Sequence, residues 1–336
     1  MQSKLNLLKN YPFLKDASNY VKDLDFSLNE LLTDMAFEQV RILGKERVIK
    51  AIKGIDIQED YGKPEIEILS YPIARIIVSC IKDNYLIRRY AYSESARSYH
   101  KMKNESLDNL LLIAKDFGIN PQIITNIHLH FTDYIRFACN IKEKKWKLVN
   151  RKLENGYVEV TKQEFARLLQ EAIRERIQSK LPLEIPKDIS FVLREYIAEV
   201  KQVLNKKEKE KIKISSKSDA SLKTDNFPPC IKNILDNLTQ GVNLAHSARF
   251  ALTSFLLNIG MDVDKIINLF NTSPDFKEDK TRYQVQHISS GKYIPPSCAT
   301  MATYSQCIGK DELCKRINHP LSYYKLKCEK NSKSHI

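Results

Sequence analysis

Four cysteines constrain how the last third of this chain can fold. Cys230 is followed by a long gap, after which Cys298, Cys307 and Cys314 come in close succession as C-x8-C-x6-C. The gap itself carries the apolar spacing of helices. If the four thiols meet, they therefore fix both ends of a compact helical unit at one point.

These thiols have several interpretations. Disulfides require an oxidising compartment, and the N-terminus has no apolar stretch typical of a secretion signal. Structural zinc favours C-x2-C turns, which the sequence lacks. An iron–sulfur cluster is larger and takes ligands from separate loops, so it suits loose spacing better. Unrelated buried cysteines would give the same spacing, which by itself leaves these alternatives open.

Other segments come with these cysteines in a fixed order. They are NLAHSARF at 243–250, YQVQH at 283–287 and PPSC at 295–298, while YPIAR at 71–75 and RRYA at 88–91 lie earlier. In this order, the later segments closely resemble the C-terminal domain of the archaeal and eukaryotic DNA primase large subunit. The earlier two resemble its N-terminal half more loosely. The resemblance implies that Cys230, Cys298, Cys307 and Cys314 hold one 4Fe–4S cluster.

The same resemblance implies a nucleic-acid site. His246 and Arg249 lie three residues apart, on one face of an expected helix. With Tyr283 and His287 they would form a cationic pocket with an aromatic wall, which suits a phosphorylated end of a nucleic acid. The resemblance assigns these four residues to the 5′-triphosphate end of the primer and the template beside it. Ala245 stands where relatives often have a second basic residue, so a weaker grip on the triphosphate is expected.

The hydrophobic pattern predicts a mainly α fold of two domains. Residues 1–204 should form a helical domain with a small α+β insertion, and residues 205–226 a flexible linker rich in lysine, serine and glutamate. Residues 227–328 should form the helical iron–sulfur domain, followed by a tail at 329–336. A helix is expected from Ser27, where S-x-x-E forms a capping box, with Gly44 as a candidate break.

The insertion is predicted from a change of period after Pro121. Segments 127–131, 134–137 and 147–160 have strand character, the last with a turn at Asn155-Gly156, and a second capping box opens a helix at Thr161.

Further His and Cys side chains are weaker candidates for ligands. His128 and His130 would face one way on a strand, but the sequence offers no third ligand nearby. Cys80 is expected in the core, and Cys139 and Cys328 as spare thiols.

Charge favours an anionic partner. Lys and Arg number 54 against 41 Asp and Glu, which gives a formal net charge of +13 and supports binding to polyanions. No apolar run is long enough for a membrane helix, and no Gly-rich phosphate loop is present in the sequence. We therefore expect a cytoplasmic, nucleoid-associated protein without membrane contact, of archaeal more than eukaryotic type.

The sequence offers no carboxylate pair for two-metal nucleotidyl transfer. The two D-x-D strings, at Asp23 and Asp262, precede helical pattern, where aspartate serves as an N-cap. The resemblance implies a non-catalytic regulatory subunit that binds a catalytic small subunit as a heterodimer through its N-terminal domain. It would bind single-stranded DNA template and RNA primer or initiating nucleotide, and so promote primer synthesis in DNA replication. The alternatives are a self-contained iron–sulfur DNA repair enzyme of the glycosylase or nuclease class, and a zinc-stabilised binding module.

Overall fold

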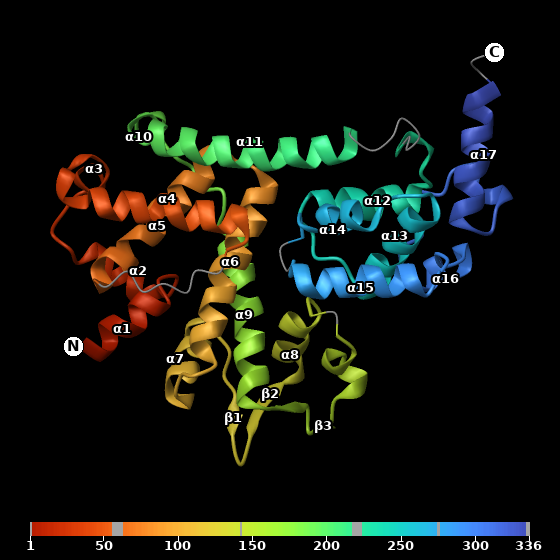
Figure 1. Ribbon diagram of the computed structural model, residues 1–336. Coiled ribbons are helices and arrows are strands. Elements are labelled where there is room, and N and C mark those ends of the chain that lie inside the picture. Colours follow the sequence, from red (N-terminus) through yellow and green to blue (C-terminus); the bar gives the residue numbers. More distant parts are fainter. Residues whose placement is uncertain (1, 56–62, 142, 217–223, 274–275, 334–336) are drawn as a thin grey trace. The chain divides into compact units, whose positions relative to one another are not determined.

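The computed structural model describes residues 2–55, 63–141, 143–216, 224–273 and 276–333. By its internal contacts the chain forms two compact units, Met1–Leu204 and Asn205–Ile336, here called the first and second units. Helices make up most of both, and a four-stranded sheet lies in the first (Figure 1). The expected mainly α fold class is confirmed. None of the helices in the described ranges has the length and apolarity that a membrane crossing requires.

The elements of the first unit follow in chain order. They are α1 (Gln2–Asn10), α2 (Lys15–Lys22), α3 (Leu28–Thr33), η1 (Met35–Phe37), α4 (Glu38–Lys53), α5 (Pro64–Ile81), α6 (Asn84–Met102), α7 (Leu107–Asp116), β1 (Gln122–Ile123), β2 (Ile127–His130), α8 (Phe131–Ala138), η2 (Lys144–Trp146), η3 (Leu148–Asn150), β3 (Leu153–Glu154), β4 (Tyr157–Val160), α9 (Lys162–Ser179) and α10 (Lys187–Val192); α11 (Arg194–Ser216) begins in this unit.

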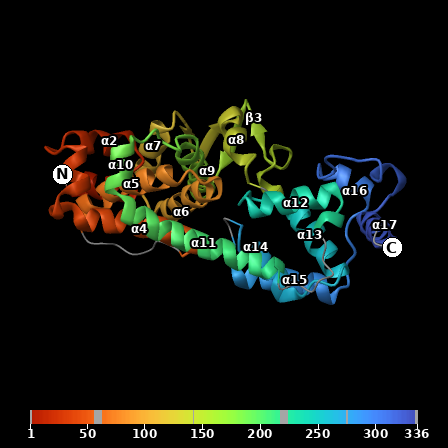
Figure 2. The same cartoon turned by 90° about the horizontal axis from the view of Figure 1, so that it is seen from above.

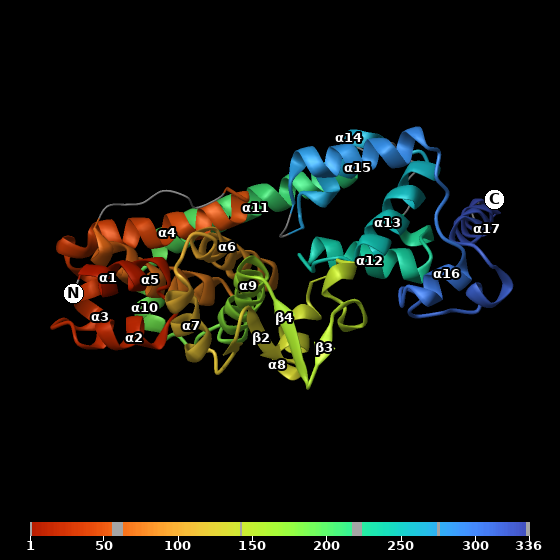
Figure 3. The same ribbon diagram turned by 90° about the horizontal axis from the view of Figure 1, so that it is seen from below.

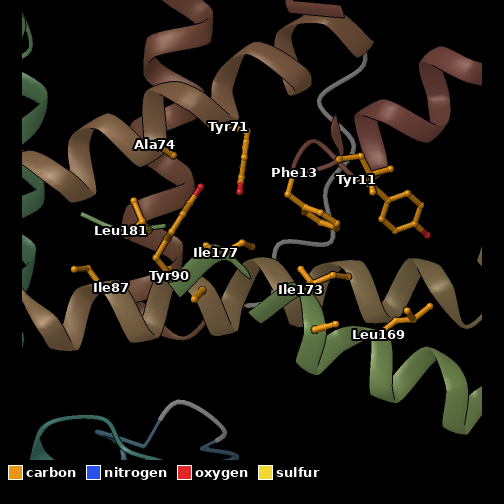
Figure 4. Close-up of a cluster of buried hydrophobic side chains, with 14 of the residues drawn as sticks. Tyr11, Phe13, Tyr71, Ala74, Ile87, Tyr90, Leu169, Ile173, Ile177 and Leu181 are labelled. Carbon is orange, nitrogen blue, oxygen red and sulfur yellow. The ribbon is translucent and has the colours of Figure 1, made fainter. Parts of the chain in front are cut away.

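Helices α4, α5, α6 and α9 surround the core of the first unit. Figure 4 shows Tyr71 of α5, Tyr90 of α6 and Ile173 of α9 turned into one apolar cluster. Gly44 does not break its helix, contrary to the expectation from the sequence. It lies inside α4, where a Cβ atom would come within 2.6 Å of the Ile73 side chain on α5. The missing side chain lets α4 and α5 approach closely.

A buried charge network crosses this core. Arg47 donates to Glu94 at 2.9 and 2.7 Å and to Glu67 at 3.3 Å, and Arg97 donates to Glu67 at 2.7 Å. All four side chains are almost completely buried. The charges of two cations and two carboxylates thus neutralise one another in the interior, away from water.

The sheet has the antiparallel order β1-β2-β4-β3. Figure 3 shows its strands β2, β4 and β3. Asn155 and Gly156 both have positive φ, 49° and 82°, and form the predicted turn between β3 and β4. The strands predicted at 134–137 and 147–149 are wrong: the first lies in α8 and the second overlaps η3. In α8, Tyr134, Phe137 and Ala138 are buried at helical spacing, and four residues were too few to distinguish the two periods.

Both predicted capping boxes are present, at Ser27 before α3 and at Thr161 before α9. Asp262 caps α14 as expected, its side chain accepting from the Asp264 N–H. Asp23 does not act as an N-cap, because it lies at the C-terminal end of α2 and Ser27 begins the next helix.

The second unit is helical throughout its described part. Its elements are η4 (Thr224–Asn226), α12 (Pro229–Thr239), α13 (His246–Asn258), α14 (Val263–Phe270), α15 (Glu278–Ser290), α16 (Cys298–Thr303), η5 (Cys314–Arg316) and α17 (Pro320–Lys333). Helices α14 and α15 lie side by side (Figure 2). Asn226 joins the two ends of the unit, because its amide donates to the Cys328 sulfur at 3.2 Å and its oxygen accepts from Asn331 at 2.6 Å.

The predicted linker at 205–226 is partly helical. α11 continues past Leu204 to Ser216, because this stretch has no Gly or Pro and is rich in Lys and Glu, which favour helix. Thr224–Asn226 forms η4, and residues 217–223 lie outside the described ranges.

Candidate functional site

The four cysteines singled out in the sequence line one cavity of about 190 Å³ in the second unit. Cys230 lies in the first turn of α12, Cys298 begins α16, Cys307 follows α16 in a loop and Cys314 begins η5. Most other lining residues are apolar, with Lys310 as the cationic one. We call this space the cysteine cavity. Four separate segments of chain deliver the thiols to it, namely α12, the start of α16, the loop after α16 and η5.

Hydrogen bonds hold two of these segments. The Cys298 N–H donates to the Asn318 carbonyl at 2.9 Å, and the Cys314 N–H donates to Asp311 Oδ1 at 2.9 Å. The other Asp311 oxygen accepts from the hydroxyl of Tyr323 at 2.6 Å. Tyr323 is buried, so α17 anchors the loop that carries Cys314.

Burial raises the pKa of the Cys230 thiol to about 12, and the three neighbouring cysteines act in the same direction. Burial also raises the pKa of Cys298 and Cys314, while Lys310 opposes the shift at Cys298. The protein alone therefore disfavours thiolates in this cavity. Iron cations would reverse that preference, because coordination deprotonates a thiol.

Four thiols are a donor set that either a zinc ion or an iron–sulfur cluster can use. A tetrahedral zinc ion holds its sulfurs about 2.3 Å from one point. Within the described ranges, no group of three or more His, Cys, Asp or Glu side chains has the arrangement for one metal ion. Four thiols delivered from separate elements to one cavity are the loose arrangement that a multi-iron cluster accommodates.

The remaining candidate ligands lie elsewhere. Cys80 is half-buried against the first core, Cys139 is exposed, and Cys328 accepts from Asn226. His128 and His130 are half-buried on one side of β2, and His130 Nδ1 lies 2.7 Å from the Thr132 hydroxyl.

The predicted nucleic-acid residues on α13 differ in their surroundings. His246 is exposed at the first position of the helix. Arg249 is half-buried, and its guanidinium donates to the Leu244 carbonyl at 3.2 Å, to Asn243 Oδ1 at 3.0 Å and to Ser273 Oγ at 3.2 Å. These bonds fix the orientation of the guanidinium at the start of α13.

The structure brings Tyr283 and His287 together on α15, with ring centroids 6.3 Å apart and planes 11° from parallel. Tyr293 continues this row, with its ring 5.9 Å from that of His287 and 5.8 Å from that of Phe250 on α13. We call these four residues the aromatic row. Tyr283 is 72% exposed and Tyr293 43%, so their faces are accessible for stacking.

Sequence reasoning missed Phe250 and Tyr293. Phe250 lies four residues after His246, which places both on one face of α13. That spacing was a usable signal. Tyr293 lies between two helices, where no periodicity could have assigned its direction.

Comparisons with family models and with known proteins all match this chain to one family. Residues 220–332 match the family model for the C-terminal domain of the eukaryotic and archaeal DNA primase large subunit, and residues 120–189 match the model for its N-terminal domain. A DNA primase large subunit of Methanococcoides burtonii is 48% identical over 331 residues, covering 94% of this chain and 90% of that protein. The corresponding protein of Methanosarcina acetivorans is 46% identical, with 94% and 87% covered. That of Halobacterium salinarum is 36% identical, with 95% and 92% covered.

Proposed function

The chain belongs to the archaeal and eukaryotic family of DNA primase large subunits, and we propose that it is the non-catalytic regulatory subunit of a two-subunit primase. Its partner would be the catalytic small subunit, bound through the first unit. Its role would be to promote the start of RNA primer synthesis. The observation that carries the proposal for the second unit is the single cavity shared by Cys230, Cys298, Cys307 and Cys314.

Those four cysteines would hold a 4Fe–4S cluster. When bound, the cluster supplies positive charge that keeps the thiols ionised and a rigid centre that joins the α12, α16 and η5 segments. Asp311 and Tyr323 orient the Cys314 segment from outside the cavity. In this proposal the cluster has a structural role.

The aromatic row and the start of α13 would bind the 5′ end of a primer beside the template. Exposed rings stack on bases without regard to sequence, a contact that contributes about 1–3 kcal/mol per base. Arg249, held by three hydrogen bonds, presents a guanidinium of fixed orientation, which favours phosphate. Holding a primer end near the partner's metal ions would speed initiation through proximity and orientation.

The cluster is tested by iron and sulfide analysis after anaerobic purification. We expect about four irons and four sulfides per chain. Serine at any of the four cavity cysteines should lower the iron content, whereas Cys328→Ser, the matched control outside the cavity, should not. Zinc with no iron would favour the zinc-stabilised module.

The nucleic-acid role is tested with the reconstituted pair of subunits in two assays, one of binding to a 5′-triphosphorylated RNA primer and one of de novo priming. Tyr283→Ala should weaken binding of a 5′-triphosphorylated RNA primer by about 5- to 150-fold, since the exposed ring contributes stacking energy. Lys232→Ala, an exposed cation on α12, serves as the control.

Arg249→Ala should reduce initiation, and unchanged initiation would count against the pocket. Nicking or base excision by this chain alone would favour the repair enzyme instead.

A further inference from the structure

The second unit contains a groove of about 660 Å³ between the η5 segment and α17. Three cations line it, Lys315 and Arg316 from η5 and Lys325 from α17, together with Asn318, Ser322 and one carboxylate, Glu329. We call this surface the basic groove. None of its lining residues belongs to the aromatic row or to α13.

The charge of the basic groove is not fully neutralised. Lys315 donates to Glu312 at 2.5 Å, with both side chains exposed. Arg316 and Lys325 are exposed, and no described residue accepts a hydrogen bond or forms an ion pair with either side chain. Even with Glu312 counted beside the lining carboxylate Glu329, three cations face two carboxylates, and the surplus of one positive charge attracts an anion.

The basic groove adjoins the cysteine cavity. Ile317 lines both, and Lys315 and Arg316 directly follow Cys314. The hydrogen bonds that fix the Cys314 segment, from its N–H to Asp311 and from Tyr323 to Asp311, also fix one wall of the groove. Through Asp311 these bonds link the two walls of the groove, η5 and α17, and so fix the distance between their cations.

We propose that the basic groove binds the phosphate backbone of single-stranded template DNA, at a site separate from the one for the primer 5′ end. Arg316 offers a fork of donors for phosphate, Lys325 a point charge, and Asn318 and Ser322 neutral donors. No aromatic ring lines the groove, so contacts should be to phosphates, without base preference. This inference rests on the proposed function, in which the second unit binds the primer end beside the template.

The test measures binding of the full-length protein to a single-stranded DNA with a 5′-hydroxyl, by fluorescence anisotropy across a salt series. Each phosphate contact on a single strand contributes about 0.7 to the slope of log K against log salt. The double variant Arg316→Gln/Lys325→Gln should therefore lower the magnitude of the slope by about 1.4. Glu329→Gln removes the opposing charge and should tighten binding. Lys232→Gln, a cation outside the groove, is the matched control, and iron content and thermal unfolding verify that each variant is folded.

Two results would overturn the proposal. One is a double variant whose salt slope equals that of Lys232→Gln. The other is an equal loss of 5′-triphosphorylated RNA binding in the groove variant, because that would make the groove part of the primer site. Failure of the primer site itself has a different signature, in which Tyr283→Ala leaves triphosphorylated RNA binding unchanged while the groove variant still loses DNA.

Discussion

Arg47 has its guanidinium in the interior of the first unit, where Glu94 and Glu67 accept its hydrogen bonds. Ser70 accepts a further bond at 3.1 Å. Charges taken out of water are tolerated only when they are paired and hydrogen-bonded. The network is therefore sensitive to the loss of any member.

Replacing Arg47 with Met should destabilise the first unit by about 3–5 kcal/mol, since the buried Glu94 would lose its cation and Glu67 would keep only Arg97. Urea unfolding followed by fluorescence is a direct measure, because Trp146 is the only tryptophan in the chain and is buried in this unit. The control is Arg136→Met, whose pair with Glu175 is exposed and should contribute less than about 1 kcal/mol. Equal losses in the two variants would contradict the role assigned to burial.

For single residues, the sequence predicted which residues belong to a site better than it predicted their neighbours in space. The four cavity cysteines were singled out through a resemblance, and the structure places them in one cavity. The partners of Arg249 were not predictable, because Ser273 lies 24 residues away and reaches it only through the packing of helices. Tyr293 was missed for the same reason.

The crossing of α4 and α5 depends on Gly44. A Cβ at this position would come within 2.6 Å of Ile73 Cγ2 and 3.0 Å of the Ser70 carbonyl oxygen. Gly44→Ala should therefore destabilise the first unit by about 1–3 kcal/mol through overpacking, although Ala favours helix by about 1 kcal/mol. Urea unfolding followed by Trp146 emission measures the change. A gain in stability would show that the two helices can separate at little cost.

The capping box of α9 should make stability depend on pH. Burial alone would raise the pKa of Glu164, but hydrogen bonds from Arg151 and from the Thr161 N–H lower it overall. A carboxyl with a lowered folded-state pKa stabilises the protein above its unfolded pKa, near 4.3, and this contribution is lost as pH falls through the folded value. Glu164→Gln should thus be less stable than the parent at pH 7, and the difference should shrink below about pH 4.

Unfolding at pH 7, 5 and 3 tests this, with Glu154→Gln as the exposed control. A Glu164→Gln difference that grows on acidification would reverse the sign and refute the assignment.

Elements were predictable where their signals were local. Ser27 and Thr161 each mark a helix start within four residues, and both were found. The strand predicted at 134–137 is wrong, because four residues are too few to distinguish helical from alternating burial. The Lys- and Glu-rich run after Leu204 was judged by its lack of apolar residues, but the same residues favour helix, and α11 extends through it.

Each unit has a large apolar core of its own. Removal of the proposed cluster with chelator and oxidant should therefore lower the melting temperature of the second unit, because metal binding energy is also folding energy. The transition reported by Trp146 should not move, since that residue lies in the first unit. Circular dichroism and Trp146 fluorescence on one sample separate the two transitions, with Cys328→Ser as a control that keeps its iron. A common shift of both transitions would show that the units unfold together.

Asn226 donates to Cys328 and accepts from Asn331, so η4, which precedes the helices α12 to α17, lies beside the C-terminal part of α17. A domain whose ends lie close together tolerates insertion into a surface loop of another protein. Inserted in this way, the unit would not need to pull the two sides of the host loop apart. The same closeness of the ends predicts that a circular permutant, with these ends joined and a new break in another loop, would keep the fold of the unit.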